Sequence, residues 1–68
     1  MLYLVEVRLY DDDLAASLNA ARACLDHHHL KPKIFRVSLA PERHLHVAFM
    51  AEGEAAAFVH TFGGRLVG

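Results

Sequence analysis

The sequence predicts an α+β fold of the ferredoxin-like kind, in which the order βαββαβ gives one antiparallel sheet with two helices on one face. Three observations lead to this prediction. Three segments alternate apolar and polar side chains as strands do, two segments carry apolar residues at helical spacing, and a short apolar tail follows the second of these. The 68 residues are enough for a single domain over residues 1–68, with marginal stability.

The first strand and the first helix follow from the N-terminal part of the chain. Residues 2–10 (LYLVEVRLY) alternate with period two, and the less apolar side carries Glu6 and Arg8. The three aspartates at 11–13 then supply an N-cap and a favourable negative charge for a helix start. One apolar stripe predicts a helix over residues 14–28, ended by the Lys-Pro pair that follows.

The remaining elements are a hairpin, a second helix and a short strand. Residues 33–40 (KIFRVSLA) and 44–50 (HLHVAFM) alternate again around a short turn, which predicts a β-hairpin. Residues 51–64 (AEGEAAAFVHTFGG) carry one apolar helical stripe, begin with two glutamates near the positive helix end, and close on two glycines. The tail at 65–68 (RLVG) predicts a last edge strand.

This order of elements leaves one face of the sheet uncovered, because both helices cross over on the same side. The alternation places on that face Leu2, Leu4, Glu6, Arg8, Tyr10, Ile34, Arg36, Ser38, His44, His46, Ala48 and Met50. The large apolar residues of this set are predicted to form an interface: Leu2, Leu4, Ile34 and Met50. A contiguous apolar patch usually marks an interface, so we expect a homodimer or a higher oligomer.

The polar side chains of the uncovered face are the candidate ligand-binding group. They are Glu6, Arg8, Tyr10, Arg36, His44 and His46. Such a group can bind a small carboxylate, or act as a general acid and base inside a dimer. It can equally be a solvated sheet face with cross-strand charge pairs. No residue is predicted to be catalytic, and no cofactor is expected.

The histidines raise the question of a metal. His44 and His46 leave the same strand face about 6.5 to 7 Å apart at the Cα atoms, a spacing that can seat one ion. A zinc site needs three or four protein ligands, and the further candidates are Glu6 or a group from a second subunit. We predict no metal ligands and keep a histidine-based metal module as an alternative. Successive side chains of the histidines at 27–29 point about 100° apart on a helix, so they cannot all converge on one ion. Their position near the C-terminal end of the helix instead favours an interaction with its negative dipole end.

Composition narrows the classes of partner. Seven Lys and Arg against eight Asp and Glu give a formal net charge of −1, so no nucleic-acid partner is expected. The apolar runs are far shorter than the roughly 20 residues of a membrane helix, so no membrane partner is expected. The single cysteine, Cys24, cannot form an internal disulfide, which predicts the reducing cytoplasm as the location.

Two stretches together carry a family resemblance: LYLVEVRLYDDDLAASLNAARACLDHHHLKPKIFRVSL and RHLHVAFMAEGEAAAFVHTFGG. Over residues 2–67 the chain resembles a small ACT-type regulatory domain, in particular the short form in the regulatory subunit of acetolactate synthase. The resemblance implies a dimer that regulates a metabolic enzyme and binds an amino acid or other small ligand at the subunit interface, near the loop after the first strand. Asp11 and Asp12 match the family's acidic position there, but the glycine that usually follows is missing.

The start MLYLVEVRL with a ferredoxin-like order is also similar to muconolactone isomerase and other dimeric α+β barrel enzymes. The sheets of those enzymes pack face to face around a pocket, and their chains are usually longer. That resemblance implies a pocket lined by Glu6, Arg36, His44 and His46. The leading expectation is a non-enzymatic regulatory or interaction module.

Overall fold

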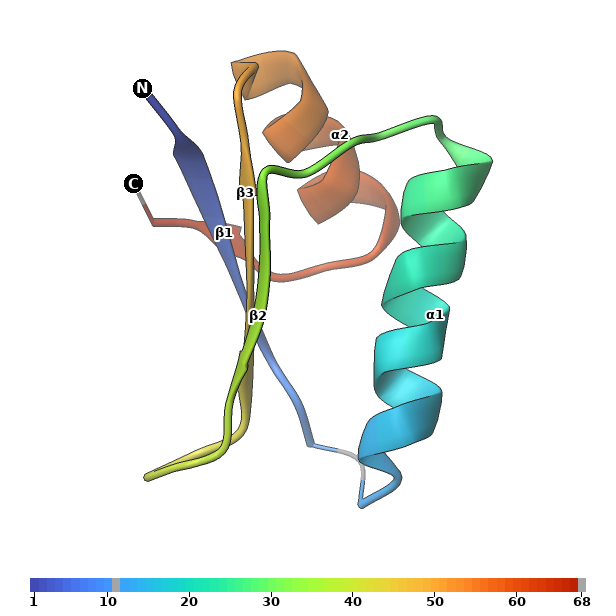
Figure 1. Cartoon of the computed structure of the whole chain (residues 1–68), viewed down its shortest axis with the longest axis vertical. Coiled ribbons are helices and arrows are strands. Elements are labelled where there is room, and N and C mark those ends of the chain that lie inside the picture. The colour runs from blue at the N-terminus through green and yellow to red at the C-terminus, as the bar shows by residue number, and fades with distance from the viewer. Residues whose placement is uncertain (11, 68) are drawn as a thin grey trace.

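The computed structural model describes residues 1–10 and 12–67 and confirms the α+β class (Figure 1). Its elements follow the predicted order: β1 (Tyr3–Arg8), α1 (Leu14–His27), β2 (Ile34–Ser38), β3 (His44–Phe49), α2 (Glu52–Thr61) and β4 (Arg65–Leu66). The strands pair antiparallel in one sheet with the order β2-β3-β1-β4, which is compatible with the ferredoxin-like arrangement.

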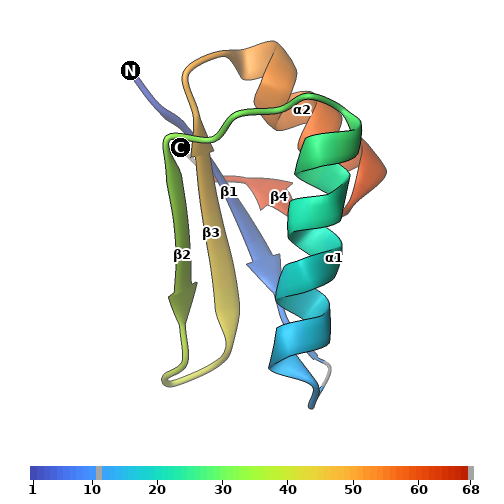
Figure 2. The same cartoon turned by 45° about the vertical axis from the view of Figure 1, so that its right-hand side comes forward.

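Both helices lie on the same side of the sheet, and the other side is uncovered (Figures 1 and 2). The core fills the space between these two layers. Its largest fully buried side chains come from β1, β3 and α2: Val5, Leu45, Val47, Phe49 and Phe58. Successive strand side chains point to opposite faces, so the alternation seen in the sequence is the reason that these residues meet the helices.

Each strand is shorter than its own alternation predicts. β1 stops at Arg8 although the pattern runs to Tyr10, because β3 begins at His44, the partner of Arg8. One further hydrogen bond is made beyond this point, from Leu9 N–H to Arg43 O at 2.9 Å. A strand pairs only as far as its neighbour extends, so its end is set by the neighbour.

Hydrogen bonds close to both ends of α1 cap this helix. Asp13, one of the three aspartates predicted to supply the N-cap, is the observed cap, and its side chain accepts a hydrogen bond from Ala16 N–H at 3.0 Å. At the other end His29 is left-handed, with a φ of 56°. Its N–H donates to Asp26 O at 3.2 Å, and Leu30 N–H donates to Leu25 O at 2.8 Å. These two bonds form a Schellman motif, which ends the helix before the proline that was expected to end it.

The connection from α2 to β4 turns on two glycines. Gly63 and Gly64 have φ values of 119° and 93°, which favour glycine. Gly64 also passes close to β1, since a Cβ there would lie 2.6 Å from Val7 Cγ2 and 2.7 Å from Glu6 O. This close approach lets Arg65 begin β4 directly beside Glu6.

Replacing each of these glycines by alanine distinguishes the cost of backbone strain from the cost of a steric clash. Both Gly63→Ala and Gly64→Ala put a Cβ on a backbone with positive φ, but among the described residues the Cβ meets a neighbour only at position 64. We expect Gly64→Ala to lower the free energy of unfolding by about 1 to 3 kcal/mol more than Gly63→Ala does. Urea denaturation of both variants measures the difference, and equal losses would contradict the packing constraint.

A glycine at position 29 should stabilise the end of α1. A non-glycine residue in the left-handed conformation costs about 1 to 2 kcal/mol. We expect His29→Gly to raise the free energy of unfolding by about 0.5 to 1 kcal/mol. This gain is smaller than the strain that is relieved, because glycine has more conformational freedom in the unfolded chain. His27→Gly is the control, since residue 27 is helical and glycine there costs about 1 kcal/mol. Chemical denaturation measures the change in the free energy of unfolding for both variants. A loss of stability in both would argue against this cap.

Candidate functional site

The strand register arranges the uncovered face in rows that cross the sheet. The first row is Arg36, His46, Glu6 and Arg65, on β2, β3, β1 and β4. On one side of it lies the row Ser38, His44 and Arg8, and on the other side the row Ile34, Ala48 and Leu4. We call the first two rows the polar half. The row of Ile34, with the exposed Leu2 and Met50 beyond the strand ends, is the apolar half.

Glu6 is the centre of the polar half. Its Oε2 lies 3.2 Å from His46 Nε2, and its Oε1 accepts a hydrogen bond from Arg65 Nη2 at 3.3 Å. The hydrogen bond with His46 lowers the pKa of Glu6 below its ordinary value of 4.5. Partial burial of the carboxyl opposes this shift, and Arg65 supports it. Glu6 therefore keeps its negative charge further into the acid range than an isolated glutamate.

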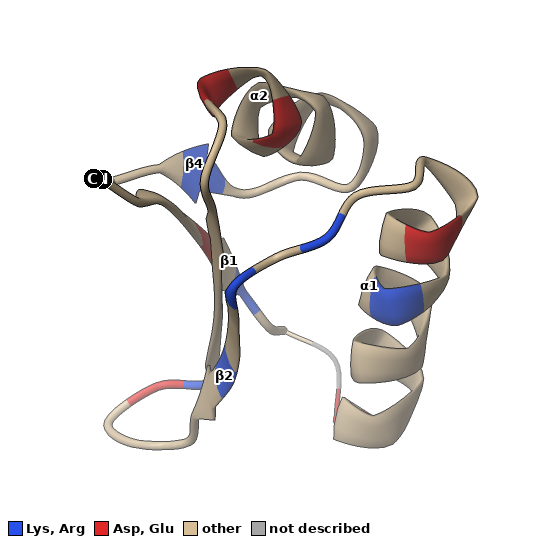
Figure 3. Cartoon of the chain, turned by 45° about the horizontal axis from the view of Figure 1, so that its top comes forward, with Lys and Arg blue, Asp and Glu red and all other residues tan. Residues whose placement is uncertain are grey.

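A second carboxylate enters from the turn between β2 and β3. Glu42 Oε1 forms an ion pair with Arg8 Nη2 at 2.7 Å, and Glu42 Oε2 lies 3.8 Å from His44 Nε2. Figure 3 shows acidic and basic residues side by side in this turn. The His44 ring stacks on the His46 ring, with centres 6.0 Å apart and 22° between planes. This stack joins the second carboxylate to the network of Glu6.

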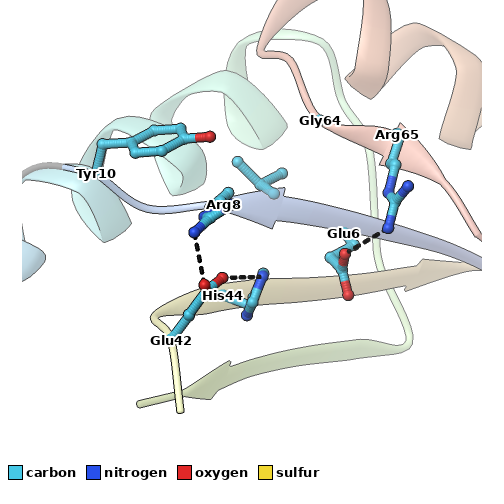
Figure 4. Close-up of a pocket in the computed structure, with 8 residues that line it drawn as sticks. Glu6, Arg8, Tyr10, Glu42, His44, Gly64 and Arg65 are labelled. Atoms are coloured by element: carbon cyan, nitrogen blue, oxygen red, sulfur yellow. Dashed lines mark hydrogen bonds and ion pairs between the residues drawn. The ribbon is translucent and has the colours of Figure 1, made fainter. Parts of the chain in front are cut away.

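A hollow of about 570 Å³ opens where these groups meet the edge shared by β1 and β4 (Figure 4). We call it the polar hollow, and its walls are Glu6, Val7, Arg8, Tyr10, Glu42, His44, Gly64 and Arg65. Two guanidinium groups and two carboxylates line the same space. Such a lining can hold a ligand carboxylate through the arginines and a ligand ammonium through the glutamates.

A smaller hollow of about 260 Å³ lies over β3, between the polar and apolar halves. We call it the central hollow, and its walls are Leu4, Ile34, Arg36 and His46. Ala48 pairs with both Leu4 and Ile34 and is the small middle residue of their row. A larger side chain at position 48 would fill this space. The central hollow is therefore apolar along one side, whereas Arg36 and His46 line the other.

The structure divides the predicted ligand-binding residues of the sheet between the two hollows. Tyr10 and His44 line the polar hollow, whereas Arg36 and His46 line the central hollow. Tyr10 is 81% exposed, and its ring centre lies 5.3 Å from the guanidinium carbon of Arg8. The predicted residues thus belong to one face but to two neighbouring spaces.

The two aspartates predicted from the loop after β1 do not join this group. Asp12 is exposed and lines neither hollow. Its carbonyl oxygen accepts a hydrogen bond from Leu14 N–H at 3.2 Å, so its backbone belongs to the start of α1. Asp11 lies outside the described residues, and its role in ligand binding stays a prediction.

The predicted interface residues share one end of the face. Leu4 and Ile34 flank Ala48 in their row. Leu2 and Met50 lie just outside β1 and β3 and are 38% and 54% exposed. The apolar half is therefore a continuous end of the sheet rather than scattered single residues.

Four residues of the polar hollow are not among the site residues predicted from the sequence: Val7, Glu42, Gly64 and Arg65. The sequence places Glu42 in a turn and Arg65 in the last strand, but gives no register between them and β1. One feature of the sequence could have predicted Arg65 as a site residue. A glutamate on one strand and an arginine on the neighbouring edge strand form a favourable cross-strand pair. Such a pair can be used only once the register is known.

The described residues hold no group of three or more His, Cys, Asp or Glu that could bind a metal ion. Beside the histidine pair, Glu6 and Glu42 are already paired with Arg65 and Arg8. Among the described residues the metal alternative therefore has two imidazoles but lacks the set of ligands that a zinc site uses.

Comparisons of the chain with protein-family models, with curated proteins and with solved structures give no match. None of the helices in the described part of the chain has the length and apolar character needed to span a membrane.

The lowered pKa of Glu6 predicts a pH-dependent contribution to stability. A carboxyl whose pKa is lower in the folded chain than in the unfolded chain stabilises the fold above the unfolded value of 4.5, and this contribution is lost as the pH falls through the folded value. We expect the difference in unfolding free energy between wild type and Glu6→Gln to be largest near neutral pH and to shrink below pH 4.5. Urea denaturation over a pH series measures it.

Arg65→Gln is the matched variant for this experiment. It should lose less stability than Glu6→Gln in the same pH range, because His46 has the larger effect on Glu6. The assignment of the pKa shift to His46 would be contradicted if the difference in unfolding free energy between wild type and Glu6→Gln did not vary with pH. It would also be contradicted if Arg65→Gln lost more stability than Glu6→Gln.

Proposed function

We propose that this chain is a small, non-enzymatic regulatory or protein-interaction module that forms a homodimer through the apolar half of its uncovered face. The central hollow carries this proposal. Leu4 and Ile34 rise on either side of the small Ala48, so the face offers both projecting aliphatic groups and a space that receives one. A surface with both features is complementary to a second copy of itself.

Charge also favours a particular arrangement of two copies. With the two-fold axis parallel to the rows, between the row of Ile34 and the exposed Leu2 and Met50, the apolar halves overlap and the polar halves project at opposite ends. The ion pairs of Glu6 and Glu42 then stay in contact with solvent. Association does not have to desolvate them, which is the main cost of burying paired charges.

A ligand beside this interface would make the dimer regulatory. An amino acid carries a carboxylate and an ammonium, which match the arginines and glutamates of the polar hollow. By the resemblance to ACT-type domains, the dimer would dock on a metabolic enzyme. The free thiol of Cys24 fits a reducing compartment, and we propose the cytoplasm.

Sedimentation equilibrium over a concentration series tests the homodimer. We expect wild type to sediment as a dimer at micromolar concentration. Ile34→Asp puts a charge into the apolar half of both copies and should weaken the dimer about a hundredfold, since each copy loses a buried aliphatic side chain.

Leu39→Asp is the matched control. Leu39 is a 61% exposed leucine that follows β2 and lies outside the apolar half, so its replacement should leave the dimer intact. A wild-type protein that stays monomeric at micromolar concentration would refute the homodimer. Equal weakening by both variants would refute the assignment of the interface to the apolar half.

A further inference from the structure

β2 is an edge strand of the sheet. Among the described residues it pairs only with β3, and the order β2-β3-β1-β4 puts it at the outer end (Figure 2). Its whole length, Ile34–Ser38, therefore has no neighbouring strand of the described chain on its outer side. We call this outer side the β2 edge.

The strand register determines which backbone groups point outward at the β2 edge. In an antiparallel sheet, successive residues direct their N–H and C=O groups alternately to the two sides of the strand. Leu9 N–H donates to Arg43 O, so the odd-numbered residues of β3 face β1 and the even-numbered ones face β2. The partners of these even-numbered residues on β2 are Ile34, Arg36 and Ser38. Phe35 and Val37 therefore direct their N–H and C=O groups outward, and such an edge can pair with an added strand.

The side chains along the β2 edge carry positive charge. Arg36 lies within β2, Lys31 and Lys33 lie on the segment that leads into it, and all three are exposed. None of the three forms an ion pair with a described residue. Residues 31–41 contain no Asp or Glu, and Figure 3 shows the basic positions following one another along this segment and strand. The positive charge of the β2 edge is therefore not compensated locally.

Arg36 differs in this respect from the arginines of the polar hollow. Arg8 and Arg65 are each paired with a glutamate. The neighbour of Arg36 in its row is His46, and Glu6 contacts that histidine from the other side, on β1. Arg36 can therefore take a carboxylate from outside the chain without displacing one that is already bound.

We propose that the β2 edge binds an extended acidic segment of a partner protein as an additional antiparallel strand. A residue opposite Arg36 would stand in a pair without hydrogen bonds, where opposed side chains lie closest, so an acidic residue is favoured there. The residues before and after it would exchange hydrogen bonds with Val37 and Phe35. Both of these side chains are only partly buried against the core, so apolar side chains of the partner would cover them. A second acidic residue, three places after the first, would lie opposite Lys33.

A second copy of this chain does not supply such a segment. Pairing of β2 with β2 of another copy brings residues 31–41 together with themselves, so Arg36 and Lys33 gain no carboxylate and approach the cations of the other copy. Positive charge at a sheet edge keeps copies of a chain apart, and the same charge selects an acidic strand. The proposal rests on the interaction role proposed above but not on the homodimer, because an added strand lies in the plane of the sheet and the homodimer packs on its face.

The probe is a capped peptide, Thr-Val-Glu-Val-Thr-Glu, titrated to about 5 mM into nitrogen-15-labelled protein, a range that detects millimolar affinity. The amide signals of Phe35 and Val37 should shift, because their N–H groups receive the new hydrogen bonds. Methylation of the N–H of the second valine removes the donor to Phe35 O and should weaken binding about tenfold. Methylation of the N–H of the first glutamate is the matched control, since this group points away from β2 and its loss should leave binding unchanged.

Charge substitutions in the protein test the selection of an acidic segment. Arg36→Gln should weaken binding of the glutamate peptide about threefold. Arg65→Gln is the matched control, because it removes the same charge from the opposite edge of the sheet and should leave binding unchanged. Arg36→Glu should reverse the preference, so that Thr-Val-Lys-Val-Thr-Lys binds more tightly than the glutamate peptide.

Several outcomes would overturn the proposal. These are no shift at Phe35 and Val37 at the highest peptide concentration, equal binding of the two methylated peptides, or equal effects of Arg36→Gln and Arg65→Gln. Shifts at Phe35 and Val37 that grow with protein concentration in the absence of peptide would also overturn it, because they would place a second copy at the β2 edge.

A variant of the apolar half separates this proposal from the homodimer. Leu2→Asp puts a charge beside β1, two strands away from β2, and should give a monomer. Peptide binding that persists in this monomer supports the β2 edge as the binding site even if wild type also proves to be monomeric. A wild-type dimer that binds no peptide refutes the β2 edge alone and leaves the homodimer standing.

Discussion

The packing of both helices against one face of the sheet is the constraint on which the other features depend. Phe49 of β3 and Phe58 of α2 are fully buried, with ring centres 5.8 Å apart. Phe58 stacks in turn on Phe62 at 5.2 Å, next to the glycines that lead to β4. These contacts hold α2 against the sheet and fix where the last strand starts. With all apolar packing on one side, polar side chains of the strands are confined to the other.

The uncovered face is organised by strand register more than by composition. A single row joins Arg36, His46, Glu6 and Arg65 from all four strands, and of the two rows beside it one is polar and the other is aliphatic. Polar groups that lie far apart in the sequence are thereby brought within hydrogen-bond distance, as the 3.2 Å contact of His46 with Glu6 shows. The same register keeps the aliphatic residues together at one end. One face can therefore serve two kinds of contact without mixing them.

The sequence predicts side-chain faces better than it predicts strand ends or pairing. Alternation correctly assigns Glu6 and His46 to the same face, because the strand period depends on each strand alone. Their contact with Arg65 depends on how the last strand aligns with β1, which no local pattern encodes. Glu42 is missed for a related reason, since its side chain reaches Arg8 from a turn whose course is set by the hairpin. Asp13, by contrast, acts within its own helix, and its cap is predictable.

The short length of β4 has a consequence for motion. Its two residues, Arg65 and Leu66, are both exposed, and segments with little buried surface open locally at a small fraction of the free energy of global unfolding. When β4 separates, the free edge of β1 extends back toward Leu4, whose carbonyl then loses its partner Val67. The free length of the β1 edge is then set by a local equilibrium, and the hydrogen bond between Glu6 and Arg65 is lost each time the chain's own C-terminal strand separates.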